Sequence, residues 1–350
     1  MKLDSGDRVL VTGASGFIGS AVTRQLVARE QEVIALVEPG ADTTNLDGLD
    51  VKQVVGDLRS SEDVQGAVNG CRAVFHVAAL YRFWARDPEA FYAINVDGTR
   101  NVLDAARESG VERLVYTSTV GTLGLEHVSG SHSANERSFP DVRHLYGSYK
   151  RSKYVAEHEV LRAIAEGLPA SLVLPTFPVG PGDRVPTPTG KLVLDFLNGR
   201  MPAYVDTVLN VAHVDDLAAG HVLALEQGRT GRSYILGGEN LTLQQVLAEL
   251  AALTGLPAPY GKVPKSLALA VAAVSELVEG RFLRRHPSVP LEAARMSTSQ
   301  MSFDISRARA ELGYAPRPAV EALEASARWF AASGMVSEGR LSRIHWSSDR

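Results

Sequence analysis

The stretch VLVTGASGFIG at residues 9–19 constrains the fold more than any other part of the chain. Its first three residues predict a buried strand, and Gly13, Gly16 and Gly19 follow at equal steps of three. Apolar residues then recur at helical spacing, which predicts a helix after the turn. A strand, a tight glycine turn and a helix N-terminus form an anion site, because backbone N–H groups and the helix dipole point at one spot. The spacing is GxxGxxG and not the usual GxGxxG, so glycines of an ordinary turn are the alternative.

Strands and helices alternate through the first half of the chain. This alternation predicts an α/β protein with a Rossmann-type doubly wound parallel sheet, followed by a smaller, mostly helical substrate-binding region. Strands are predicted at 9–11, 32–37, 51–55, 73–78, 113–117 and 171–175, and helices at 61–68, 91–109, 148–166, 191–198, 241–254, 265–279, 306–312 and 319–333. We expect a dinucleotide-binding domain over 1–180, to which 206–238 return, a substrate-binding region over 181–205 and 239–335, and a flexible tail over 336–350.

Charge and cysteine content limit the partners and the compartment. The net charge of −4 does not indicate a nucleic-acid partner. Cys71 is the single cysteine, which excludes an internal disulfide and favours a cytoplasmic location. The apolar stretch 266–278 is too short to span a bilayer, so no integral membrane segment is expected. A packed helix is the expected identity of that stretch, with contact to a membrane surface as the alternative.

Two carboxylates follow predicted strands at the edge where a dinucleotide would bind. Glu38 ends the second strand, where a carboxylate bonds the 2′-hydroxyl of the adenosine ribose and repels a 2′-phosphate. Residues 39–46 contain no Lys or Arg, so the sequence favours NAD(H), with NADP(H) as the alternative. A solvated surface glutamate is the competing interpretation. Asp57 ends the third strand, where it would accept a bond from the adenine amino group or cap the next helix.

Tyr149 and Lys153 form a YxxxK pair in a predicted helix. Residues four apart share a helix face, and a nearby ammonium lowers the pKa of a phenol that is otherwise near ~10. Such a tyrosine exchanges the proton of an alcohol while hydride moves to or from nicotinamide. Tyr146 and Lys150 have the same spacing and form a rival pair. No metal site is expected, because His213 has no second ligand spaced with it.

Taken together, six motifs resemble the extended short-chain dehydrogenase/reductase family, over about 310 residues. They are TGASGFIG at 12–19, GDL at 56–58, HVAA at 76–79, NVDGT at 95–99, YTST at 116–119 and YKRSK at 149–153. Within this NAD-dependent epimerase/dehydratase group, the chain is similar to hopanoid-associated sugar epimerases and dihydroflavonol 4-reductases. The closer match lies at 81–88, 187–207 and 237–245.

The resemblance implies roles for individual residues. Tyr149 would be the general acid/base, Lys153 would tune it, and Thr119 would be the catalytic hydroxyl, with Ser118 as the adjacent alternative. The cofactor would be held by Gly13, Gly16, Phe17, Ile18, Glu38, Asp57, Leu58, Val77, Ala78, Ala79, Asn95, Thr117, Tyr149, Lys153, Pro175 and Thr176. Tyr81, Arg82 and Trp84 would face the substrate, or else form an ordinary surface loop. Asn95 would reach the cofactor, or else only tie its helix to a strand.

The expected function is an NAD(P)-dependent oxidoreductase that acts on a small-molecule ketone or alcohol. One alternative is a sugar epimerase that oxidises its substrate transiently; the other is a dinucleotide-sensing protein without turnover. Nucleotide-sugar epimerases carry a late arginine motif, which Arg281, Arg284 and Arg285 do not match. Family members pair through helices corresponding to 91–109 and 148–166, so a homodimer is expected.

Overall fold

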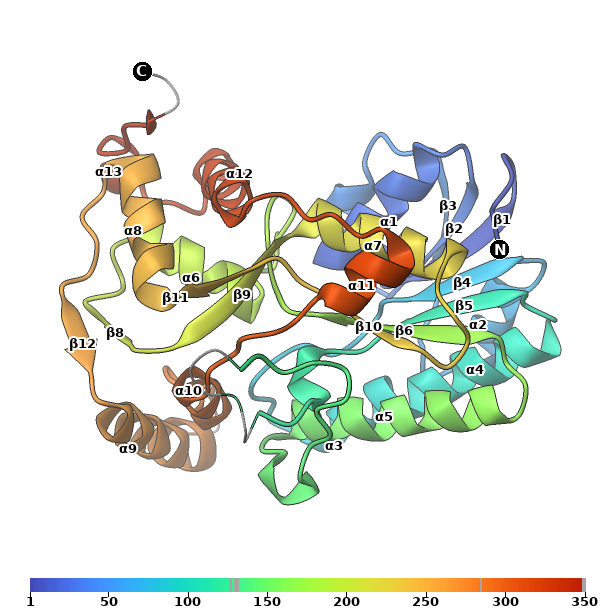
Figure 1. Ribbon diagram of the computed structural model, residues 1–350, viewed down its shortest axis with the longest axis horizontal. Helices are drawn as coiled ribbons and strands as arrows, with labels where there is room; N and C mark the ends of the chain where they lie inside the picture. The colour runs from blue at the N-terminus through green and yellow to red at the C-terminus, as the bar shows by residue number, and fades with distance from the viewer. Residues whose placement is uncertain (126–127, 129–131, 284, 348–350) are drawn as a thin grey trace.

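The computed structural model describes residues 1–125, 128, 132–283 and 285–347. Its main element is a seven-stranded parallel sheet in the order β10-β6-β5-β4-β1-β2-β3 (Figure 1). The strands are β1 (Arg8–Thr12), β2 (Glu32–Val37), β3 (Val51–Val55), β4 (Ala73–His76), β5 (Arg113–Thr117), β6 (Ala170–Pro175) and β10 (Ser233–Leu236). The strand order reverses between β1 and β4, so a switch point lies at the carboxyl ends of these two strands. This sheet confirms the predicted Rossmann-type fold.

Helices cover both faces of the sheet, as its nearly continuous apolar strands require. Helices α1 (Phe17–Val27), α7 (Val214–Glu226) and α11 (Ser306–Leu312) lie on one face. Helices α2 (Ser61–Val68), α4 (Gly98–Glu108) and α5 (Ser148–Ala165) lie on the other (Figure 1). The predicted helix over 91–109 is divided into α3 (Glu89–Tyr92), the π-helical turn η2 (Ala93–Asp97) and α4. Such turns are frequent at functional sites, and η2 contains Asn95.

The second region contains more strand than its predicted helical character indicates. A three-stranded sheet joins β7 (Phe177–Val179), β9 (Val208–His213) and β11 (Glu239–Thr242), and β8 (Ala203–Val205) pairs with β12 (Gly261–Val263). The helices there are α6 (Pro188–Leu197), α8 (Leu243–Thr254), α9 (Lys265–Ser275), η5 (Glu276–Phe282), α10 (Leu291–Thr298), α12 (Ala319–Ala332) and α13 (Glu338–Leu341). The helix predicted from residue 241 begins at Leu243, because Thr242 caps it in a capping box with Gln245.

Packing differs from the expected domain boundaries in two places. Residues 301–314 were expected in the substrate-binding region, but Phe303, Leu312 and Tyr314 are buried in the core of the large sheet. The expected flexible tail packs in its described part, 336–347, because its apolar side chains contact the second core. These are Val336, Leu341, Ile344 and Trp346.

Candidate active site

The glycine turn between β1 and α1 is shaped for close approach. Gly13 has a φ of +67°, and a Cβ built there would lie 2.8 Å from Cα of Ala78. Gly16 begins α1 in extended conformation, and no side chain in the described part of the chain caps this helix. The first N–H groups of α1 therefore remain available to an anion. This cradle fits the pyrophosphate of a dinucleotide, with Phe17 and Ile18 in the first helical turn.

A buried histidine fixes the neighbouring strand end. His76 Nδ1 lies 2.8 Å from Oγ1 of Thr12, and its Nε2 lies 2.9 Å from Oγ1 of Thr99. Burial lowers the pKa of His76 to about 3, so the ring is neutral at physiological pH. The backbone N–H groups of Val77 and Ala78 both donate to Thr12 Oγ1, at 3.2 Å. Thr12 and His76 thereby hold residues 77–78 against the glycine turn.

Asn95 connects this edge to the helix that carries the expected catalytic pair. Its Oδ1 accepts from the backbone N–H of Leu80 at 2.7 Å, and its Nδ2 donates to Oγ of Ser152 at 2.9 Å. Ser152 lies on α5 between Tyr149 and Lys153. In the described structure, Asn95 makes the tie between helix and strand end that was the alternative to cofactor contact.

Tyr149, Thr119 and Lys153 lie together at the carboxyl end of β5. Burial raises the pKa of Tyr149, and the neighbouring Thr119 side chain opposes this shift. Lys153 Nζ donates to the backbone carbonyl of Thr117 at 2.7 Å and lies 4.4 Å from the ring centroid of Tyr116. Burial lowers the pKa of Lys153 to about 7, and Glu157 opposes the shift. The sequence predicted a net lowering of the Tyr149 pKa by Lys153; the structure differs, because burial dominates and the ammonium bonds a carbonyl instead.

The structure separates each expected residue from its neighbouring alternative. Ser118 Oγ donates to Glu157 at 2.6 Å, so this hydroxyl is bonded to a carboxylate two turns further along α5 and not to Tyr149. Tyr146 precedes the first residue of α5, so it does not share a helix face with Lys150. Its ring instead lies under the guanidinium of Arg295, 4.4 Å from the centroid. The rival pair is therefore broken by the start of the helix.

Asp57, which follows the end of β3, is paired with a residue that the sequence analysis did not single out. Arg59 Nε lies 3.0 Å from both carboxylate oxygens of Asp57, and this contact lowers the aspartate's pKa. Glu38 is exposed at the end of β2 and lies near enough to Arg59 to raise its pKa. The alternative role of Asp57 as a helix cap is wrong, because Ser60 caps α2. The position of Arg59, two residues after the aspartate, was the available signal.

The three expected substrate residues have different surroundings. The ring of Tyr81 lies 4.9 Å from that of Tyr149, next to the expected catalytic hydroxyl. Trp84 contacts the second region, with its ring 5.8 Å from that of His286 and its Nε1 beside Gly280. Arg82 is exposed. The loop therefore connects Tyr149 to the second region through aromatic contacts.

The remaining expected residues lie at the carboxyl ends of strands or just after them. Pro175 ends β6, and Thr176 Oγ1 donates to the carbonyl of Asn210 at 2.8 Å. Thr117 Oγ1 lies 3.0 Å from Nε2 of His221. Leu58 accepts a bond from Asn101, and Ala79 is half-buried beside Leu80. His213 caps α7 by accepting from the N–H of Asp215 at 3.1 Å, which agrees with a structural role.

Glu292 is a buried carboxyl that sequence reasoning missed. It lies on α10 against the start of α5: a Cβ at Gly147, which has a φ of +84°, would collide with its carboxylate. The backbone of Lys150 hydrogen-bonds to Glu292, whereas Oε1 has no partner among the described residues. Burial raises the pKa of Glu292 to about 8, and the charge of Lys150 opposes this shift. No sequence motif marks it, because the contact joins residues 145 positions apart.

Comparison with known proteins decides the family. The profile of the NAD dependent epimerase/dehydratase family matches residues 9–237. The chain belongs to this family. It is 44% identical over 334 residues to a Synechocystis sp. protein named provisionally as a dihydroflavonol 4-reductase, covering 94% of this chain and 96% of that one.

Further similarities extend over nearly the whole chain. It is 35% identical over 328 residues to sterol demethylase protein B of Methylococcus capsulatus, covering 93% and 99% of the two chains. The crystal structure of gox2253 superimposes with a TM-score of 0.84 at 45% identity, covering 95% of this chain and 100% of that one. The chain is thus an NAD(P)-dependent enzyme of the extended short-chain dehydrogenase/reductase type, in a family that includes reductases and epimerases.

Proposed function

We propose that this enzyme transfers hydride between a nicotinamide dinucleotide and a ketone or secondary alcohol, with Tyr149 as the general acid/base. The observation that carries the proposal is the buried Tyr149 beside Thr119, one helical turn from Lys153, whose Nζ is anchored on the carbonyl of Thr117. All three lie at the carboxyl edge of the sheet, to which Asn95 and residues 78–80 connect the glycine turn. When bound, the cofactor supplies or accepts the hydride.

The chain's own residues handle the proton. Burial keeps the proton on Oη of Tyr149 at neutral pH, so the phenol is ready to donate to a ketone oxygen. Thr119 fixes the direction of that hydroxyl and would bond the same substrate oxygen. Lys153, anchored on Thr117, would hold the nicotinamide ribose and stabilise Tyr149 after it loses its proton. The arrangement favours reduction at neutral pH, since the donor is protonated.

For the cofactor, we propose NAD(H) in preference to NADP(H). The support is Glu38, whose exposed carboxylate stands at the end of β2 and would repel a 2′-phosphate. The family description, NAD dependent, agrees with this preference. Arg59 is the residue that opposes it, because a guanidinium near Glu38 would attract a 2′-phosphate.

For the substrate, we propose a carbonyl compound or alcohol with an apolar body. The loop that follows β4 is aromatic: Tyr81 and Phe83 pack edge to face with centroids 6.0 Å apart, and Trp84 faces His286. The relative from Methylococcus is named for a sterol, which is apolar. Arg285, at the place of a late arginine motif, pairs with Glu279 at 2.9 Å, and Arg284 lies outside the described residues. A nucleotide-sugar epimerase has less support for this reason.

The decisive experiment compares Tyr149→Phe with Tyr146→Phe, which makes the same change at the rival tyrosine. Tyr149→Phe should lower kcat by ~10²-fold or more with NADH and a reducible ketone, and leave NADH binding nearly unchanged. Tyr146→Phe should retain wild-type turnover. Equal activity of Tyr149→Phe and wild type would contradict the acid/base role. Product formation from a sugar without net NADH consumption would favour the epimerase.

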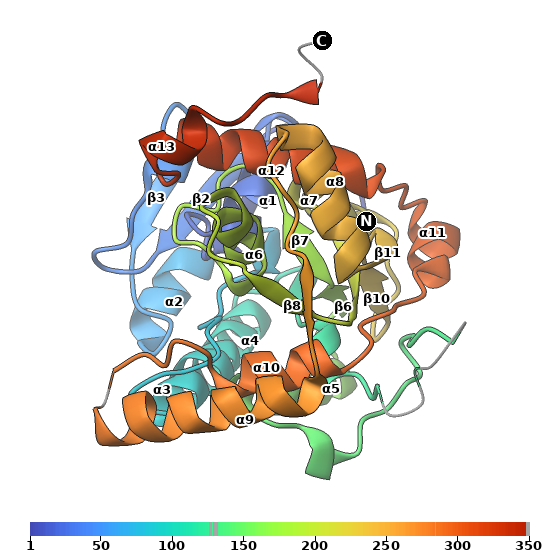
Figure 2. The same cartoon turned by 90° about the vertical axis from the view of Figure 1, so that its left-hand side faces the viewer.

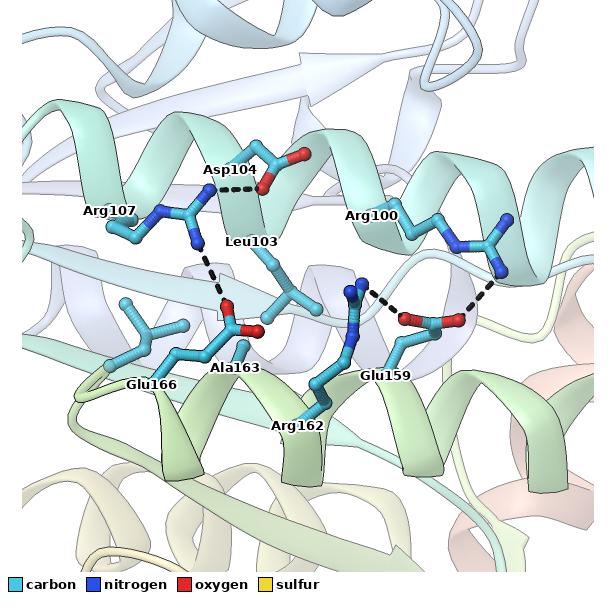
Figure 3. A pocket seen from close by; sticks show the side chains of 9 residues that line it. Arg100, Leu103, Asp104, Arg107, Glu159, Arg162, Ala163 and Glu166 are labelled. Carbon is cyan, nitrogen blue, oxygen red and sulfur yellow. Dashed lines mark hydrogen bonds and ion pairs between the residues drawn. The ribbon is translucent and has the colours of Figure 1, made fainter.

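We also propose a homodimer through the outer faces of α4 and α5, in a cytoplasmic enzyme. Two ion pairs link these helices: Arg100 of α4 contacts Glu159 of α5, and Arg107 of α4 contacts Glu166 at the end of α5 (Figure 3). Arg162 contacts the same Glu159 from within α5. The pairs fix α5, with Tyr149, against α4 and leave Val155 and Leu161 exposed on the same helix. Light scattering at several protein concentrations tests the proposal, and a monomer at all of them would contradict it.

A further inference from the structure

The second region carries an exposed apolar stripe on α9 and η5. Leu267, Val271 and Val274 follow one another at steps of four and three, so they share one face of α9, and the exposed Val278 and Phe282 continue this apolar surface along the π-helical η5. Val274 is 61% exposed and Phe282 is 74% exposed. A helix that packs only against its own domain would turn such residues inward. We call these five residues the α9 stripe.

The charged residues of this segment lie outside the α9 stripe. Residues 262–286 contain five Lys or Arg and two Glu, although the whole chain has a net charge of −4; Lys262 pairs with Asp206 and Arg285 pairs with Glu279. Both glutamates are directed to the protein: Glu276 accepts from the N–H of Leu291, and Glu279 accepts from Ser275 and Ser288. Lys265 and Arg281 are exposed at the two ends of the stripe. The exposed surface is thus apolar with cationic ends.

Figures 1 and 2 place α9 at one end of the molecule, the lower end in both views. The green loop around Val142 lies at the same end, and it exposes Phe139 and Val142. Among the described residues, no helix is long and apolar enough to cross a bilayer. The stripe therefore has the properties of a helix that lies in the plane of a membrane interface, with its apolar side chains inserted and its cations near lipid phosphates.

We infer that the α9 stripe docks the enzyme on the surface of an anionic lipid bilayer. The charge of the segment selects this occupant, because a cationic rim is attracted to anionic headgroups and a second copy of the same face would repel it. Docking also brings the substrate side of the site to the membrane. Gly280 of η5 contacts Trp84, and α10, which packs beside α9, carries Glu292 to the first turn of α5.

The test measures co-sedimentation of the full chain with vesicles, and needs no enzyme activity. The wild type should bind phosphatidylcholine vesicles that contain phosphatidylglycerol, and bind more weakly at high salt or to phosphatidylcholine alone. Val271→Glu/Val274→Glu should weaken binding roughly tenfold or more, because two inserted side chains become charged. Both positions are exposed, so the thermal unfolding temperature should not change.

A control is Val55→Glu, which makes the same type of change at another exposed valine, 66% exposed. Val55 belongs to β3, which lies at the end of the molecule opposite to α9 (Figure 1). It should bind vesicles as the wild type does. The inference is overturned if wild-type protein fails to bind anionic vesicles at low salt, or if the double variant binds them equally well. It is also overturned if the double variant only converts a dimer into a monomer, since the stripe would then be an interface between copies.

Discussion

Lys153 Nζ donates a 2.7 Å hydrogen bond to the backbone carbonyl of Thr117, the last residue of β5. This bond fixes a buried amine at the end of the central strand β5, one helical turn after Tyr149 on α5. Burial lowers the pKa of Lys153 to about 7, so the ammonium is present below this pH and is lost as the pH rises through it. The positive charge that the proposed mechanism requires on Lys153 therefore depends on the pH.

The first prediction concerns that ammonium. Lys153→Met should lower kcat by ~10²-fold or more, because Tyr149 loses the charge that stabilises its deprotonated form. The KM for the dinucleotide should rise as well, since Lys153 is expected at the ribose. Steady-state kinetics checks both values. Lys191→Met, on the exposed face of α6, is the control and should leave both unchanged. A Lys153→Met enzyme with normal kcat would remove Lys153 from the mechanism.

The second prediction concerns Asn95. Asn95→Ala removes the bond to the Leu80 N–H and the bond to Ser152, and leaves a buried amide without its acceptor. We expect a loss of about 1–3 kcal/mol in the free energy of unfolding and a lower affinity for the dinucleotide. Urea denaturation and a cofactor titration measure these changes. Ser152→Ala removes the bond from Asn95 and the bond from Ser152 to the Tyr149 carbonyl, but it keeps the acceptor of the Leu80 N–H and should have a smaller effect; the reverse order would refute Asn95 as the link.

Much of the fold was predictable from the chain, because the buried strands are short apolar runs and the glycine turn marks the start of α1. The YxxxK pair was visible from its spacing, but the choice of Tyr149 over Tyr146 rested on the resemblance. The start of α5 at Ser148, which agrees with the helix predicted over 148–166, excludes Tyr146, and Gly147 precedes this helix with a φ of +84°. The surroundings of Glu292 depend on contacts between distant segments, which no local pattern encodes, whereas Arg59 pairs with Asp57 only two residues away. The packing of the described part of the tail against the second core was not predicted, because its few apolar side chains lie among many polar residues.

The third prediction concerns cofactor choice. Wild type should have a higher kcat/KM with NADH than with NADPH, because Glu38 repels a 2′-phosphate. Glu38→Gln should raise kcat/KM for NADPH by roughly tenfold, since Arg59 then remains as the nearby charge. Adding Arg59→Gln to this variant should reverse the gain. If wild type prefers NADPH, Arg59 and not Glu38 determines the choice.

The fourth prediction concerns Glu292 and pH. Its pKa is raised from 4.5 to about 8 by burial, so the folded protein binds a proton that the unfolded chain releases between these values. The stabilising contribution of the neutral carboxyl is complete below about 4.5 and is lost as the pH rises through about 8. Glu292→Gln keeps a neutral side chain of similar size at every pH. The variant should therefore match wild type at the acidic end and be more stable at pH values above 8.

Thermal unfolding across this range measures the difference, which should be on the order of 1 kcal/mol or more at its alkaline end. Glu62→Gln, on α2 and far from the crevice, should follow wild type at every pH and serves as the control. A Glu292→Gln variant whose stability runs parallel to wild type over the whole range would show that Glu292 titrates normally. If Glu292→Gln is more stable than wild type only at acidic pH, the prediction of a raised pKa for Glu292 is wrong.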